Sequence, residues 1–166
     1  DVFSKPDRIG SLIGKGYLPE YFSLIPERIR LLEEKPLAPN DETVQGFIGG
    51  GTDLFVQKPD ELLDADHVYL INNDIHFIRC EENRCLVGAG VTFQQFAESD
   101  IIRDQIPDIK NFMKLVASLP IRNSATIGGN IVNASPIGDM SVLLLALHAD
   151  ITLVKKNQKR KFPLHE

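Results

Sequence analysis

The spacing of apolar and polar residues along the chain predicts a mixture of short helices and short strands. From Pro19 the sequence PEYFSLIPERIRLLEEK has apolar residues at helical spacing, and Pro26 suits the first turn of its longer part. The runs Val44–Ile48 and His67–Ile71 are rich in β-branched and aromatic residues, which predicts strands, with a short helix from Pro59 between them. Residues 1–18 lack periodicity and are predicted to form a linker.

The second half of the chain continues this alternation. Segments 75–80 and 85–90 alternate around a polar turn, which predicts a hairpin. Further predicted elements are a helix with a Thr92–Gln95 capping box, an amphipathic helix over 108–119, a buried helix over 140–149, a strand over 150–154 and a charged hairpin tip at 155–161. The expected fold class is α+β.

The hairpin carries the chain's two cysteines, Cys80 and Cys85. No second pair of Cys or His residues accompanies them, so the sequence does not predict a metal site. We favour two reduced thiols over a disulfide, and a cytoplasmic location.

The run Gly49-Gly50-Gly51-Thr52-Asp53 directly follows a predicted strand. Glycines allow positive φ and close approach of backbone N–H groups to an anion, so a phosphate or diphosphate is one candidate ligand. A helix beginning at Thr52 or Asp53 would add its dipole. The alternative is a tight turn in which Asp53 caps the following helix. The glycine spacing matches neither a Walker A loop nor a dinucleotide-binding fingerprint.

A second glycine segment, 125–139, reads ATIGGNIVNASPIGD. Its short hydroxyl and amide side chains match the hydrogen-bonding groups of a ribityl chain, a ribose or a phosphate. Asp139 alone could be a helix N-cap, but capping does not account for the preceding run of small polar residues. We therefore favour a ligand role for this segment.

Neither the four histidines nor the carboxylates fall at spacings typical of acid–base, nucleophilic or metal chemistry. A protein that binds a large cofactor and leaves the chemistry to it has this composition. The formal net charge of −5 argues against nucleic acid as a partner, and no apolar run approaches the roughly 20 residues that span a bilayer.

Residues 45–57 and 115–154 contain the two glycine segments. They resemble the FAD-binding domain of the molybdenum hydroxylases, the family of xanthine dehydrogenase and the carbon monoxide dehydrogenase flavoprotein. Residues 17–28 are similar to the connector that follows the iron–sulfur domains in bacterial xanthine dehydrogenases. The resemblance implies a two-lobed FAD domain: linker and connector helix at 1–38, a first lobe at 39–90 and an incomplete second lobe at 91–166. It also implies that the chain is a piece of a longer polypeptide.

The resemblance implies a role for each matching position. Residues 47–54 would wrap the FAD diphosphate and reach toward the flavin through Thr52, Val116 and Ala117 would line the adenosine side, and the second glycine segment would contact the ADP and ribityl portions. The implied cofactor-binding residues are Phe47, Ile48, Gly49, Gly50, Gly51, Thr52, Asp53, Leu54, Val116, Ala117, Thr126, Gly129, Asn130, Ser135 and Asp139.

The implied activity is electron transfer from iron–sulfur clusters through FAD to NAD⁺ or another acceptor. The implied partners are a molybdenum-binding subunit, which carries molybdopterin, and [2Fe–2S] domains, neither lying on this chain. No catalytic side chain, nucleic acid or membrane is implied, and we expect weak FAD binding and no turnover by this chain alone. Two alternatives remain: another flavoprotein oxidoreductase of the superfamily, or a flavin-free scaffold subunit.

Overall fold

The structure is a computed structural model that describes residues 6–31, 46–64, 67–69, 75–135, 137–155 and 158–166. The chain divides into two compact units, Asp1–Pro36 and Leu37–Glu166, which we describe separately. Among the described residues no helix has both the length and the apolar character needed to cross a membrane.

The first unit is helical, both where a helix was predicted from Pro19 and in part of the predicted linker. It contains α1 (Arg8–Gly14), the 3-10 helix η2 (Glu20–Leu24) and α2 (Ile25–Arg30). The Asp7 carboxylate caps α1 by accepting a hydrogen bond from the Gly10 amide (2.9 Å). The linker prediction was therefore wrong for residues 8–14, because a capped two-turn helix is too short for its periodicity to show. Pro26 lies in the first turn of α2, as predicted.

The second unit begins with a parallel pair of strands. Strand β1 (Gly46–Ile48) pairs with β2 (His67–Tyr69), with Phe47 opposite Val68. Parallel neighbours need a crossover connection, and here it contains α3 (Leu54–Gln57) and α4 (Pro59–Asp64). The predicted strands 44–48 and 67–71 are confirmed over 46–48 and 67–69; the rest lies outside the described residues.

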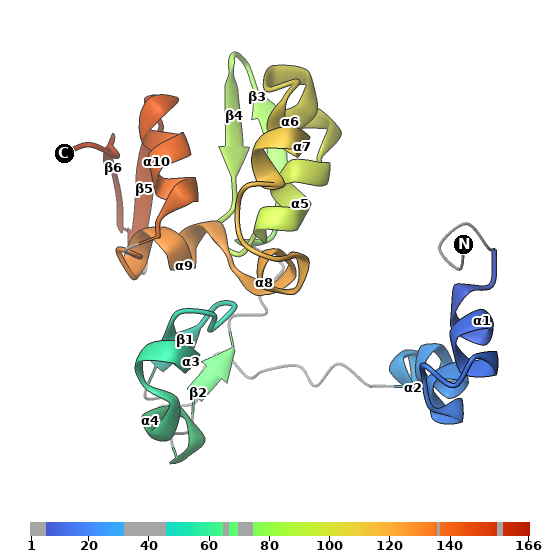
Figure 1. Cartoon of the computed structure of the whole chain (residues 1–166). Helices are drawn as coiled ribbons and strands as arrows, with labels where there is room; N and C mark the ends of the chain where they lie inside the picture. Colours follow the sequence, from blue (N-terminus) through green and yellow to red (C-terminus); the bar gives the residue numbers. More distant parts are fainter. Residues whose placement is uncertain (1–5, 32–45, 65–66, 70–74, 136, 156–157) are drawn as a thin grey trace. The chain divides into compact units, whose positions relative to one another are not determined.

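The main core lies between a hairpin and three helices (Figure 1). The antiparallel strands β3 (Ile78–Glu81) and β4 (Arg84–Val87) confirm the predicted hairpin. Ile78 and Val87 pack against a cluster supplied mainly by α5 (Phe93–Glu98), α6 (Asp100–Gln105) and α7 (Ile109–Met113). The fully or nearly fully buried members are Val91, Phe93, Phe96, Ala97, Ile102, Ile109, Met113, Val116, Ala125, Ile127 and Met140.

The predicted capping box at α5 is confirmed. The Gln95 amide donates to Thr92 Oγ1 (3.2 Å), and the Thr92 amide donates to Gln95 Oε1 (2.9 Å). We expect Thr92→Ala to lower the free energy of unfolding by about 1 kcal/mol, because the Gln95 amide loses its acceptor. Urea unfolding measures this. Thr92→Ser keeps the hydroxyl and should lose less; equal losses for both variants would contradict the assignment.

The single helix predicted over 108–119 is wrong, because the chain reverses in the middle of it. Helix α7 ends at Met113, and α8 (Leu119–Ser124) begins after Ala117, which has a φ of 45°. Pro120 lies in the first turn of α8, where its missing N–H costs nothing, but inside a continuous helix it would remove a hydrogen bond. Apolar residues therefore continue at helical spacing as far as residue 117, although the helix itself ends at Met113.

The remaining elements are α9 (Ile127–Val132), α10 (Asp139–Ala146) and the antiparallel hairpin of β5 (Asp150–Lys155) with β6 (Gln158–Pro163). Helix α10 was predicted to be buried, but only Met140 is, and Val142 is 65% exposed. The apolar residues of α10 are distributed all around the helix axis, so packing along one side leaves the residues on the other sides exposed to solvent. Residues 158–161, predicted to lie in a charged tip, instead form most of β6.

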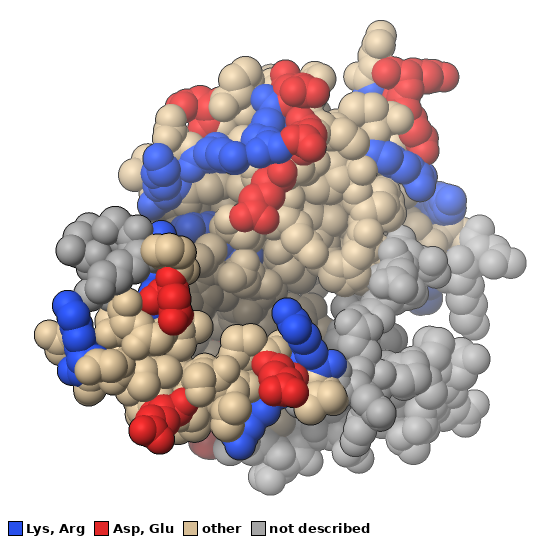
Figure 2. Space-filling model, turned by 90° about the vertical axis from the view of Figure 1, so that its right-hand side faces the viewer, with Lys and Arg blue, Asp and Glu red and all other residues tan. Residues whose placement is uncertain are grey.

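On the face seen in Figure 2, the charged side chains of the described residues show no single-sign patch. In the face seen in Figure 2, blue basic and red acidic side chains are interspersed over the described surface. The net charge of −5 is thus not gathered into one acidic region on this face. No strongly basic surface of the kind that binds nucleic acid appears there.

Candidate functional site

The two glycine segments predicted to share a ligand lie against each other. A Cβ atom on Gly49 would stand 2.7 Å from Thr126 Oγ1, and a Cβ on Gly50 would collide with the carbonyl oxygen of Ser124. Real Cβ atoms do not approach so closely, so both positions require glycine for contact with the 124–126 turn. The loop after β1 therefore packs directly onto the start of α9.

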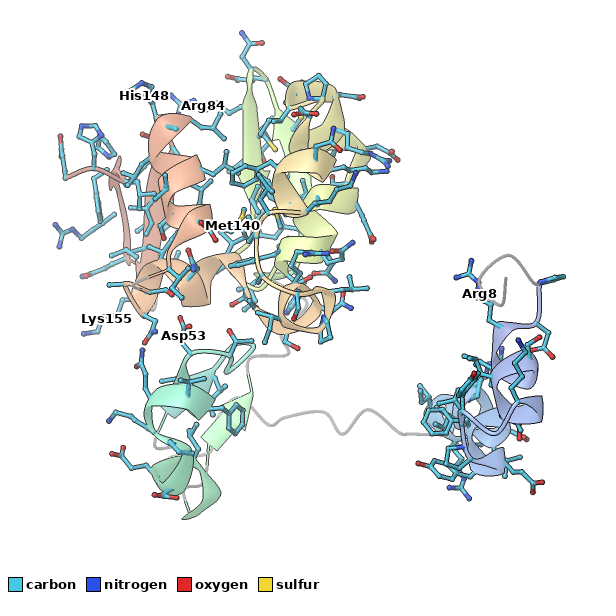
Figure 3. The ribbon with its side chains drawn as sticks, viewed as in Figure 1. Arg8, Asp53, Arg84, Met140, His148 and Lys155 are labelled. Carbon is cyan, nitrogen blue, oxygen red and sulfur yellow. The ribbon has the colours of Figure 1, made fainter. Side chains whose placement is uncertain are left out.

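A side-chain hydrogen bond links the same two segments. Asn133 Nδ2 donates to Asp53 Oδ2 at 3.0 Å, joining residues 80 positions apart. Figure 3 shows Asp53 at the end of the α3 segment nearest to α9. Asp53 holds the N-cap position of α3, as the capping alternative predicts, but its side chain makes no capping hydrogen bond. Its carboxylate holds the two segments together instead.

The first loop has backbone donors that pair with no acceptor in the part of the chain that the structure describes. Among the described residues, the amides of Gly50, Gly51, Thr52 and Asp53 have no acceptor. Gly51 has a φ of +68°, a conformation that other residues rarely adopt, and it is buried. Successive free N–H groups around a left-handed residue form the concave backbone arrangement that binds phosphate. Helix α3 begins at Leu54 and has four residues, so the dipole contribution expected from it is small.

The amides of the second segment are already used. Ile127 and Gly128 donate to the carbonyls of Val91 (2.9 Å) and Ala89 (2.8 Å), and Gly129 donates to Thr126 Oγ1 (3.1 Å). Thr126 is thus the N-cap of α9 and is buried. The second segment can therefore offer a ligand its side chains and the exposed surface of Gly129, but not these N–H groups.

Asn130 fixes the start of α10. Its buried side chain accepts hydrogen bonds at Oδ1 from the Ser141 amide (3.0 Å) and hydroxyl (2.9 Å), and within the described residues Nδ2 has no acceptor. Asp139 is the first residue of α10; Gly138 holds the cap position, so the capping role considered for Asp139 is wrong. Ser135 lies close to Asn130, whose carbonyl accepts from the Ser135 amide (3.4 Å).

The positions predicted on the adenosine side have different environments. Val116 is a core residue, whereas Ala117 is exposed at the chain reversal. Arg122, which the sequence did not single out, donates from Nη1 to the carbonyls of Val116 (2.9 Å) and Ala117 (2.8 Å) and from Nε to Gln94 (3.0 Å). Arg122 thereby links residues 116 and 117 to α8, on which it lies, and to α5. No periodicity or motif marks such a residue in the sequence.

The other predicted residues lie along the first loop. Ile48 is buried at the end of β1, Thr52 and Leu54 are half-buried, and Phe47 is described only through its backbone pairing in β1. Three glycines outside the prediction also need their lack of a side chain: Gly88 against Ile75, Gly90 against His76, and Gly128 against Ala89. They allow the 88–90 segment to reach α9. A glycine in the sequence alone does not say whether it faces ligand or protein.

This donor set fits a diphosphate-containing cofactor. The first loop has four amides without an acceptor among the described residues and no side chain at three successive positions, and the adjoining segment has Asn130 Nδ2, Ser135 and Asp139 for hydroxyl groups. Within the described residues, no cluster of three or more His, Cys, Asp or Glu could hold a metal ion. The arrangement can hold an elongated anionic ligand and orient it.

Comparison with known proteins supports this interpretation. Residues 27–166 match the sequence profile described as "FAD binding domain in molybdopterin dehydrogenase". The chain is 32% identical over 148 residues to the glyceraldehyde dehydrogenase medium chain of Sulfolobus acidocaldarius, covering 87% of this chain and 51% of that protein. It is 28% identical to the xanthine dehydrogenase FAD-binding subunit of Escherichia coli O157:H7, covering 84% of this chain and 46% of that one.

A solved structure has the same fold. A chain of reconstituted CO dehydrogenase from Oligotropha carboxidovorans superposes with a TM-score of 0.64 at 30% identity, over 72% of this chain and 42% of that one. The α+β prediction is thereby confirmed. The chain spans about half the length of the curated relatives it matches.

Proposed function

Because the chain belongs to the family of FAD-binding domains of molybdopterin dehydrogenases, with FAD as its cofactor, we propose that it carries electrons between iron–sulfur centres and a soluble acceptor. The contact between the two glycine segments is the observation that supports this proposal most strongly. It places the amides of residues 50–53 beside the small polar residues of α9 and its following loop. A single glycine turn would not need this second segment.

The protein's own residues bind and orient the cofactor. The amides of residues 50–53 would hold the FAD diphosphate, and the Asp53–Asn133 hydrogen bond would keep the two segments at a fixed separation. Thr126, Gly129 and Asn130 would face the ADP and ribityl portions, and Ser135 and Asp139 would lie along the same chain. Bound FAD supplies the redox chemistry, since flavins exchange electrons in one- or two-electron steps.

No side chain acts as an acid, base or nucleophile in this proposal. We assign substrate oxidation to a molybdenum-binding partner subunit and electron delivery to [2Fe–2S] domains, with NAD⁺ as the acceptor. The resemblance of residues 17–28 to bacterial xanthine dehydrogenases favours a purine as the substrate of the whole enzyme. The 32% identity to a glyceraldehyde dehydrogenase chain makes an aldehyde the second candidate.

Spectroscopy of the purified subunit tests the proposal. We expect the full-length subunit to show flavin absorption close to one FAD per subunit, and bleaching when NADH is added without oxygen. A colourless subunit that FAD cannot reconstitute would contradict FAD binding and favour a scaffold. A flavin bleached by dithionite but not by NADH would retain FAD binding and overturn NAD⁺ as the acceptor.

A further inference from the structure

The two cysteines face each other across the β3–β4 hairpin. Cys80 and Cys85 are directly opposed in the antiparallel register, one position beyond the Glu81–Arg84 pair that closes the two-residue turn. In such a hairpin the closing pair exchanges hydrogen bonds, and the pairs then alternate, so Cys80 and Cys85 form a non-hydrogen-bonded pair. The Cα atoms of such a pair lie about 4.5 Å apart, inside the range of about 4.4–6.8 Å that a disulfide can bridge.

Both sulfurs can be reached from solvent. The side chains of Cys80 and Cys85 are on the ribbon face that also carries Ile78 and Val87, but beyond the core edge, where both cysteines are exposed free thiols. They line an open hollow of about 290 Å³ whose other walls are Glu82, Asn83, Arg84 and Gln105. A small oxidant could therefore enter without any movement of the backbone.

Cys80 also affects the pKa of the Cys85 thiol. Partial burial, the negative charge of a Cys80 thiolate and a hydrogen bond with Cys80 raise the pKa of the Cys85 thiol. Cys85 therefore keeps its proton to higher pH and is suited to react second, once its partner has been modified. This order resolves a mixed disulfide into an internal one.

We propose that Cys80 and Cys85 form a two-electron dithiol–disulfide site that reacts with low-molecular-weight disulfides such as glutathione disulfide. The site is formed by the tip of the β3–β4 hairpin, whereas the cofactor-binding residues lie on the 49–53 loop and the segment around α9. It is therefore a redox-active site additional to the flavin.

The reaction balances as two thiol–disulfide exchanges. The Cys80 thiolate attacks one sulfur of glutathione disulfide, forming a mixed disulfide and releasing one glutathione thiolate. The Cys85 thiolate then attacks Cys80 Sγ, forming the Sγ–Sγ bond and releasing the second glutathione. The protein loses two protons and two electrons, and glutathione disulfide gains both as two molecules of reduced glutathione.

Mass spectrometry of the folded chain treated with glutathione disulfide tests the proposal. We expect the intact mass to fall by two hydrogen atoms, with the internal disulfide exceeding glutathione adducts by about tenfold because the second thiol is held beside the first. Trypsin cuts after Arg84, so the two cysteines should appear on separate peptides joined by a disulfide. Stable glutathione adducts on both cysteines, chain dimers, or two unreacted thiols would each overturn it.

A variant with a displaced thiol is the matched control. In Arg79→Cys/Cys80→Ser the thiol moves one residue along β3 to the opposite face of the ribbon, and Arg79 is exposed, so folding should be retained. We expect glutathione adducts and no internal disulfide in this variant, with circular dichroism to confirm the fold. Equal internal disulfide formation in the control would contradict the role of the cross-strand register.

Discussion

Replacing Gly50 with alanine should lower the affinity for FAD by about 100-fold and the free energy of unfolding by about 2 kcal/mol. A Cβ at this position would occupy the space of the Ser124 carbonyl, so the loop must move away from the start of α9. That movement would separate the free amides from the side chains of the second segment. Fluorescence titration with FAD measures the affinity, and urea unfolding measures the stability.

Gly14→Ala is the matched control, because it adds the same methyl group at a glycine where, apart from the neighbouring residues and the backbone of its own helix, no described atom lies within 4 Å of the new Cβ. Gly14 also lies in α1, within the other compact unit. We expect FAD affinity to stay unchanged in this variant. FAD affinity and stability near those of the unmodified protein in Gly50→Ala would show that the close approach of the two segments is not needed.

Ile109→Ala should lower the free energy of unfolding by about 3 kcal/mol. Ile109 begins α7 and is 0% exposed, in the core between the three helices and the β3–β4 hairpin. The substitution removes buried methyl groups and leaves a cavity that the surrounding side chains fill only in part. Urea unfolding of the unmodified protein and of Ile109→Ala measures this difference, provided that the free energy of unfolding has the same dependence on urea concentration in both.

Leu115→Ala provides the comparison for Ile109. Leu115 follows the end of α7 and is 85% exposed, so its truncation should change stability by no more than about 0.5 kcal/mol. A continuous helix over 108–119 would also place Leu115 off the face that carries Ile109, so the comparison tests burial in the core and not the end of α7. Similar losses at both positions would contradict the burial of Ile109 in the core and the exposure of Leu115.

The fold was predictable from the sequence where the signal is local. The Thr92–Gln95 capping box, the hairpin around 81–84 and the strands near 46 and 67 depend on neighbouring residues, and the structure has each of them. The reversal at Ala117 was not predictable, because a positive φ at a non-glycine residue leaves no sequence pattern, and Arg122 stabilises it through tertiary hydrogen bonds.

For the candidate site, the sequence predicted that two glycine segments cooperate, and the structure brings them into contact. It could not assign their separate roles. The amides of residues 50–53 have no acceptor among the described residues, whereas those of 127–129 donate to the 89–91 segment and to Thr126. The glycines at 88, 90 and 128 have packing roles that only the tertiary neighbours reveal. The individual contacts of the predicted residues with FAD stay predictions.

The central claim is that the free amides at residues 50–53 bind the FAD diphosphate, and amide NMR of the ¹⁵N-labelled chain during FAD titration tests it most directly. Weak binding of FAD is sufficient for this measurement, because fast exchange between the free and the FAD-bound chain still shifts the amide resonances. We predict the largest shift changes at Gly50, Gly51, Thr52 and Asp53, with smaller ones at Gly129 and Asn130. Changes confined to other regions, with the amides of 50–53 unmoved at saturating FAD, would contradict the account.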